Sequence, residues 1–191
     1  MKILICGAGA LGSNLSAYLS SDARDDHEIT VWDKDGVEER NIRAGTQFYL
    51  RSQIGLPKVE ALQYNIHQHF NRTIKTIDGV FTLSEKSIIR CFNLVIDCFD
   101  NFEARRAITE ACRDIPCVHL GFGKNFTWSI LWNEGYVPPE TAVDWDICEM
   151  EGAASFVRFV ASVGSLTVQE FVTKGKQREF VGNKLSMREI L

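Results

Sequence analysis

The sequence has six cysteines but no C-x-x-C pair. Structural zinc ribbons depend on such pairs, so no structural zinc is expected. A disulfide framework would also be unusual in a chain of 191 residues. Cys6 and Cys98 stand in short apolar runs, where cysteine behaves as a small buried hydrophobe. We therefore expect reduced thiols, as in a cytosolic protein.

An excess of basic residues is also missing, because 21 Lys and Arg face 25 Asp and Glu for a net charge of −4. General nucleic-acid binding is therefore not expected. No apolar run reaches the roughly 20 residues of a membrane span, since the stretch 156–172 contains Arg158, Gln169 and Glu170. No charged segment leads into a signal-peptide core. We expect a single cytoplasmic domain over residues 1–191 with no membrane association.

Hydrophobic patterning predicts alternating strands and helices. Strands are expected at Lys2–Cys6, Glu28–Trp32, Thr73–Val80, Leu94–Cys98, Cys117–Gly121, Thr127–Trp132 and Glu179–Val181, and helices at Ser13–Ser21, Lys58–Phe70, Glu103–Arg113 and Gly152–Thr173. Asp33–Gln53 and Asn133–Glu151 are expected to be loops, and a short helix is expected at the end of the tail. This order predicts an α/β, Rossmann-like fold with a mainly parallel sheet, helices on both faces and an antiparallel extension near Thr127–Trp132.

A glycine-rich turn follows the first predicted strand. Gly7, Gly9 and Gly12 form G-x-G-x-x-G, which permits a tight turn and close approach of the backbone to phosphate at a helix N-terminus. Asp33 ends the second strand, where an acid accepts hydrogen bonds from a ribose. The alternatives are a turn without a ligand and a solvated acid. These residues suit a nicotinamide dehydrogenase and an ATP enzyme equally.

Three later segments separate those two readings. Residues 33–41 match D-x-D-x-V-E-x-x-N, residues 55–62 match G-x-P-K-x-x-A-L, and residues 95–105 match hydrophobic-D-x-x-D-N-x-x-x-R. With the glycine turn, they resemble the ordered motifs of the ThiF/MoeB/HesA family, which includes the ubiquitin-activating enzymes. The resemblance covers about residues 2–132.

The resemblance implies a reaction with ATP and Mg²⁺. In it, the C-terminal carboxylate of a small β-grasp, ubiquitin-like or sulfur-carrier protein ending in glycine is adenylylated and pyrophosphate is released. Lys58 would lie by the phosphates, Asp100 would hold Mg²⁺, and Asn41 would hydrogen-bond the nucleotide. The alternatives are a solvated lysine for Lys58, a helix N-cap for Asp100 and a turn cap for Asn41. A homodimer or a heteromer is expected by the same resemblance.

The sequence departs from the family pattern in the loop after Asn41. Ala44 stands where the family usually has arginine. Either Arg43, one residue earlier, supplies the charge from a shifted loop, or that charge is missing. The chain also starts at the first strand, whereas relatives often have an N-terminal segment that reaches the partner subunit's ATP. These departures leave open a non-catalytic member that pairs with an active partner. A nicotinamide oxidoreductase is a further alternative, but it gives Lys58 and Asp100 no role.

Cys148 is the candidate nucleophile, because thioester- or persulfide-forming relatives carry a cysteine in the corresponding crossover loop. Asp144, Asp146 and Glu149 surround it, and negative neighbours disfavour a thiolate. An incidental loop cysteine is therefore the alternative. His119 is expected to be a satisfied core residue, and Trp128 and Trp132 are expected to pack on one face of a strand.

Overall fold

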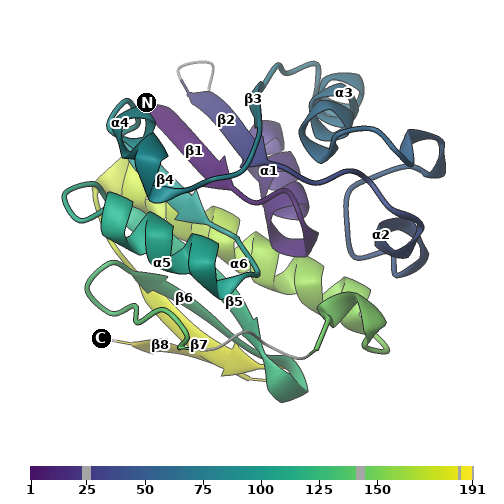
Figure 1. Cartoon of the computed structure of the whole chain (residues 1–191). Helices are drawn as coiled ribbons and strands as arrows, with labels where there is room; N and C mark the ends of the chain where they lie inside the picture. The colour runs from purple at the N-terminus through teal and green to yellow at the C-terminus, as the bar shows by residue number, and fades with distance from the viewer. Residues whose placement is uncertain (23–26, 141–144, 185, 191) are drawn as a thin grey trace.

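One sheet of eight strands runs through the described part of the chain in the order β3-β2-β1-β4-β5-β6-β7-β8 (Figure 1). The computed structural model describes residues 1–22, 27–140, 145–184 and 186–190. The strands are β1 (Lys2–Cys6), β2 (Glu28–Asp33), β3 (Lys75–Asp78), β4 (Leu94–Asp97), β5 (Cys117–Gly123), β6 (Thr127–Trp132), β7 (Glu179–Asn183) and β8 (Ser186–Ile190).

The first five strands are parallel, with β1 between β2 and β4. Cys6, the last residue of β1, pairs with Trp32 on one side and Asp97 on the other. The loops that follow β1, β2 and β4 therefore meet at one edge of the sheet, where open α/β sheets bind their ligands. Strands β6, β7 and β8 continue the sheet antiparallel. The predicted fold class and its antiparallel extension are confirmed.

Helices cover both faces of this sheet (Figure 1). Helices α1 (Ala10–Asp22), α3 (Lys58–Phe70) and α6 (Ala153–Lys174) pack on one face, and α4 (Lys86–Ile89) and α5 (Phe102–Ala111) pack on the other. The alternation of side chains along β1 feeds both cores, because Ile3 and Ile5 face the first layer while Leu4 and Cys6 face the second.

The first strand-turn-helix unit, the helix at Lys58–Phe70 and the long last helix lie where the sequence predicts them, with ends shifted by a few residues. Two predictions were wrong. The segment Asp33–Gln53 contains a short helix, α2 (Glu39–Arg43), capped by the Asn41 side chain. The short helix expected at the end of the tail is strand β8, because its backbone pairs with the free edge of β7.

The face of β6 that carries the tryptophans is buried under α6. Trp128 meets Phe159 edge to face with ring centroids 5.6 Å apart, and Trp132 lies 4.8 Å from the ring of Phe171. The predicted packing role of both tryptophans is confirmed. Among the described residues, no helix combines the length and the apolar character that crossing a membrane requires.

Candidate functional site

The glycine turn between β1 and α1 is tightly packed at two of its three glycines. Gly7 has φ +94°, and a Cβ there would lie 2.9 Å from the carbonyl oxygen of Cys98. A Cβ on Gly12 would lie 1.7 Å from the carbonyl oxygen of Gly7. A Cβ on Gly9 would meet no atom within 4 Å. Gly7 and Gly12 thus allow the turn to form, while Gly9 leaves open space beside the N-terminus of α1.

Asp33 ends β2 directly beside this turn. Its Oδ2 accepts a hydrogen bond from the Ala8 amide at 2.5 Å, and its Oδ1 accepts one from the Asp35 amide at 2.8 Å. Burial raises the pKa of Asp33, and the nearby charge of Lys58 and the two amides offset only part of that effect. A carboxylate can accept about four hydrogen bonds, so Asp33 keeps capacity for a ribose hydroxyl.

Lys58 is the first residue of α3 and lies close to the end of β2, because the backbone at Pro57 and Lys58 pairs with the backbone at Asp35 and Gly36. Its amide donates to the carbonyl of Asp35 at 2.8 Å, and Gly36 forms a bridge with Pro57. The Lys58 side chain is buried, with Nζ 3.4 Å from Asp35 Oδ2. A lysine that is buried beside a carboxylate at the sheet edge is not the solvated lysine of the alternative reading. It presents a positive charge on the same side as Asp33.

Asn41 is buried in α2, where its Oδ1 accepts a hydrogen bond from the Glu38 amide at 2.8 Å. The turn-cap alternative for Asn41 is therefore present in the structure. Its Nδ2 donates to no group within the described residues, so a nucleotide contact by Nδ2 is compatible with the cap. Arg43 is exposed at the end of α2 and has no polar partner in the described part of the chain. Its role stays a prediction.

Asp100 is exposed in the turn between β4 and α5, and no group of the described residues donates a hydrogen bond to it. The N-cap alternative for Asp100 was wrong, because Asn101 caps α5 by accepting a hydrogen bond from the Ala104 amide at 2.7 Å. Asp100 lies within electrostatic reach of the Asp33 loop. The pKa of Lys34 is raised chiefly by its contact with Asp35, and the negative charges of Asp33 and Asp100 raise it further.

Cys148 lies in a short turn (Ile147–Glu149) before α6, against the loop that follows α2. Its Sγ is 3.1 Å from Thr46 Oγ1 and accepts from Gln47 Nε2 at 3.6 Å. Burial raises the pKa of the Cys148 thiol, the two polar contacts offset part of this, and Asp146 raises it further. The predicted acidic influence of Asp146 is present, while Asp144 lies outside the described residues. The environment of Cys148 therefore disfavours a thiolate.

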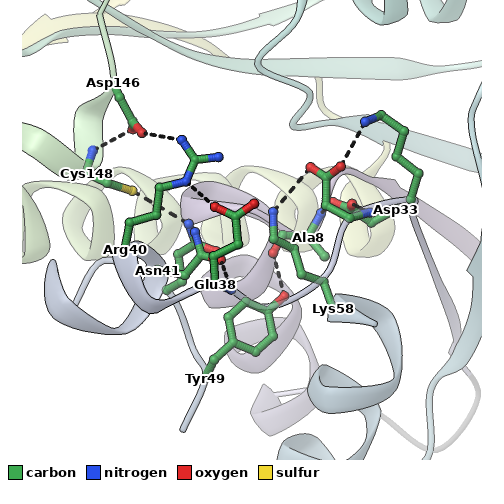
Figure 2. Close-up of polar contacts among 12 residues, drawn as sticks. Ala8, Asp33, Glu38, Arg40, Asn41, Tyr49, Lys58, Asp146 and Cys148 are labelled. Atoms are coloured by element: carbon green, nitrogen blue, oxygen red, sulfur yellow. Dashed lines mark hydrogen bonds and ion pairs between the residues drawn. The ribbon is translucent and has the colours of Figure 1, made fainter. Parts of the chain in front are cut away.

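Arg40, which the sequence left without a role, joins this cysteine-bearing turn to α2. Its guanidinium lies 2.5 Å from Glu38 and 3.5 Å from Asp146, and Asp146 Oδ1 in turn accepts from the Cys148 amide (Figure 2). The segment before α6 therefore packs against α2 and the loop that follows it.

Tyr49 is a further residue that sequence reasoning missed. Its buried hydroxyl donates to the carbonyl of Ala8 at 2.5 Å, while the Ala8 amide donates to Asp33, so both backbone groups of Ala8 are bonded to side chains (Figure 2). The Ala8 contact spans 41 residues along the chain, and no motif spacing signals it. Tyr49 and Asp33 together fix the orientation of the glycine turn.

The residues at this edge fit a magnesium nucleotide by their chemistry. The open space at Gly9 would admit a phosphate to the free amides of α1. Lys58 supplies a positive charge, and Asp100 offers carboxylate oxygens of the kind that Mg²⁺ binds.

Comparisons with known proteins point the same way. The family model of the ThiF family matches residues 1–128. A molybdopterin-synthase adenylyltransferase of Haemophilus influenzae is 32% identical over 115 residues, which are 58% of this chain and 45% of that protein. A ubiquitin-like modifier-activating enzyme 5 of Drosophila ananassae is 30% identical over 126 residues, which are 59% of this chain and 31% of that protein. The chain spans less than half the length of these curated relatives.

Solved structures share the fold at low sequence identity. A crystal structure of PaaA superposes with a TM-score of 0.75 at 18% identity and covers 99% of this chain and 63% of PaaA. A crystal structure of E. coli MccB with AMPCPP and MccA gives a TM-score of 0.76 at 16% identity, covering 99% of this chain and 62% of MccB. The match to the family model, which includes the glycine turn, Asp33, Asn41, Lys58 and Asp100, establishes that the chain belongs to the ThiF family.

Proposed function

We propose that this protein adenylylates the C-terminal carboxylate of a small protein of the ubiquitin-like or sulfur-carrier class, using ATP and Mg²⁺. The observation that carries the proposal is the grouping of the glycine turn, Asp33, Lys58 and Asp100 around the ends of β1, β2 and β4. Membership of the ThiF family supports it, as do relatives whose names describe adenylyltransferases and modifier-activating enzymes.

Binding of ATP is assigned to the carboxyl edge of the sheet. The Asp33 carboxylate would accept a hydrogen bond from the ribose, and the amides at the start of α1 would donate hydrogen bonds to phosphate oxygens beside Gly9. Asn41 Nδ2 donates to the nucleotide from α2. The contacts of Tyr49 and Asp33 with Ala8 hold the turn in place before the nucleotide arrives, which lowers the entropy cost of binding.

Transfer of the adenylyl group requires stabilisation of negative charge on the phosphates. A carboxylate oxygen of the partner attacks the α-phosphorus, and the bond between the α-phosphorus and the bridging oxygen breaks to release pyrophosphate. Lys58 would stabilise the charge that develops on the phosphates, because its ammonium is held at low exposure beside Asp35, at the same edge of the sheet as Asp33. Asp100 would hold Mg²⁺, which would further neutralise the leaving group.

We propose that the acyl partner is a protein with a flexible C-terminal glycine, because the carboxylate of such a chain end can reach the nucleotide. Arg43 is the exposed cation nearest to the family arginine position in the sequence, and we assign it to the phosphates as a secondary contact. The assembly is proposed to be a homodimer or a complex with a homologous subunit.

ATP–pyrophosphate exchange with Mg²⁺, measured against a panel of proteins ending in Gly-Gly, tests the proposal. Wild type is expected to exchange only with a suitable partner. Asp100→Ala is expected to reduce exchange by about 100-fold or more, because Mg²⁺ loses its carboxylate ligand and the charge developing on the phosphates loses its stabilisation. Asp114→Ala is the matched control, since Asp114 is an exposed acid after α5, away from the site.

Equal exchange by Asp100→Ala and Asp114→Ala would contradict the metal assignment. ATP binding without exchange for any partner would favour a non-catalytic member of the family. Failure to bind ATP, together with binding of NADH, would favour an oxidoreductase instead.

A further inference from the structure

A buried polar cluster lies directly behind the turn that carries Asp100. It joins Asp97 at the end of β4, Arg105 in α5, His119 in β5 and Tyr136 in the segment after β6. Asp97 and His119 have almost no solvent exposure, and Arg105 is 8% exposed. Asp97 Oδ2 lies 2.8 Å from His119 Nδ1 and 3.4 Å from Arg105 Nη1.

This cluster forms hydrogen bonds with both backbone groups of Phe99, the residue before Asp100. The Phe99 amide donates to Asp97 Oδ1 at 3.0 Å, and the Phe99 carbonyl accepts from Arg105 Nε at 2.6 Å. The Asp97–Arg105 pair therefore fixes the backbone orientation directly before Asp100. Arg105 is in turn fixed by donating through Nη2 to the carbonyl of Leu120 at 2.5 Å.

Tyr136 attaches a distant part of the chain to the same guanidinium. Arg105 Nη1 donates to the Tyr136 hydroxyl at 2.9 Å, a contact that spans 31 residues. The Tyr136 ring stacks on His119 with centroids 3.8 Å apart and an interplanar angle of 7°. His119 is a core residue as predicted, but within the described residues only Nδ1 is hydrogen-bonded and Nε2 is buried without a partner. The stack therefore holds Tyr136 in register with Arg105.

We propose that Tyr136 is a positioning residue that couples the segment after β6 to Asp100 through Arg105 and Phe99. The inference rests on the proposed function in one respect, namely that Asp100 binds Mg²⁺ beside the nucleotide. Because the guanidinium nitrogens lie in one rigid plane, loss of the Tyr136 contact lets the whole group shift toward Asp97. The hydrogen bond from Arg105 to the Phe99 carbonyl then weakens, and the Asp100 carboxylate is held less firmly in the position proposed to bind Mg²⁺.

Tyr136→Phe tests this coupling, because it removes the hydroxyl and keeps the ring that stacks on His119. Tyr64→Phe is the matched control, since Tyr64 is an exposed tyrosine of α3 that loses the same atom. Hydrogen–deuterium exchange of a peptide covering residues 97–105 reports on the turn without requiring activity. Faster exchange is expected there in Tyr136→Phe and not in Tyr64→Phe.

The Mg²⁺ requirement distinguishes positioning from packing. In ATP–pyrophosphate exchange, Tyr136→Phe is expected to need about tenfold more Mg²⁺ for half-maximal rate, the effect typical of losing an outer-shell partner of a metal ligand. Its affinity for ATP in EDTA is expected to equal that of wild type. If wild type lacks exchange activity, the proposed function fails, and the Mg²⁺ effect is then read from ATP affinity with and without the metal.

Two results would overturn the coupling. Unchanged deuterium uptake over residues 97–105 in Tyr136→Phe would show that the hydroxyl does not hold the turn. Faster uptake with an unchanged Mg²⁺ requirement, or no Mg²⁺ effect on wild type in either assay, would reduce Tyr136 to a packing residue.

Discussion

Gly9 and Gly12 belong to the same turn, yet a methyl group at the two positions meets different surroundings. At Gly12 it would press into the carbonyl oxygen of Gly7, and at Gly9 it would enter open space. The turn therefore separates a glycine needed for folding from one whose missing side chain leaves room for a ligand. Ala8, directly before Gly9, is held from two sides, by Asp33 and by Tyr49.

Gly12→Ala and Gly9→Ala are expected to fail in different ways. Gly12→Ala should lower the free energy of unfolding by about 1–3 kcal/mol or more through overpacking. Gly9→Ala should leave it within about 0.5 kcal/mol of wild type, while ATP affinity falls about tenfold or more, because a phosphate hydrogen bond is worth roughly 1.5–3 kcal/mol. Urea denaturation and calorimetric ATP titration measure the two effects. Equal ATP affinity of Gly9→Ala and wild type would place the phosphates elsewhere.

Asp97, the last residue of strand β4, has a buried carboxylate that contacts Arg105 of α5 and His119 of β5. Burial raises the pKa of Asp97, but the charge of Arg105 and the contact with His119 outweigh it and hold the pKa below its ordinary value. A carboxyl whose pKa is lower in the folded state adds stability above its unfolded pKa of about 3.9. That contribution is lost as the pH falls through the folded pKa.

Asp97→Asn is therefore expected to lower the free energy of unfolding at pH 7 by about 3–5 kcal/mol, because it leaves Arg105 buried without a counter-charge. The difference from wild type should shrink below about pH 4, because the carboxyl of the unfolded chain takes up a proton there while the pKa of the folded carboxyl lies lower. Urea denaturation from pH 7 to pH 3 measures this, with Asp114→Asn as an exposed control. A constant difference across that range would rule out the ionised pair.

The elements that sequence patterning predicted best are those buried by continuous apolar runs, such as β1 and β4. The short elements α2, α4 and β8 were missed, because they lack the continuous apolar run that marks β1 and β4 and their stability comes from tertiary contacts. Motif spacing likewise indicated Asp33, Lys58 and Asp100. The contact between Thr46 and Cys148, 102 residues apart, has no such signal in a single sequence.

At the scale of the whole molecule, two kinds of sheet meet at β5. The parallel half gathers the loops after β1, β2 and β4 at its carboxyl edge, and the antiparallel half, of which one face of β6 lies under α6, extends the same sheet beyond them (Figure 1). The segments that leave β6 and precede α6 return to the parallel half, through Tyr136 at Arg105 and through Asp146 at Arg40. Through these contacts both segments support elements beside the site, namely α5 and α2.

Analysis of the nucleotide products is the most direct test of the proposed adenylylation. The protein is incubated with Mg²⁺, a Gly-Gly partner that supports exchange and ATP labelled at the α-phosphate. The account predicts that the label becomes attached to the partner's C-terminal carboxylate while unlabelled pyrophosphate is released, and that Lys58→Ala suppresses both products. Release of ADP and phosphate, with no label on any partner, would contradict attack at the α-phosphorus.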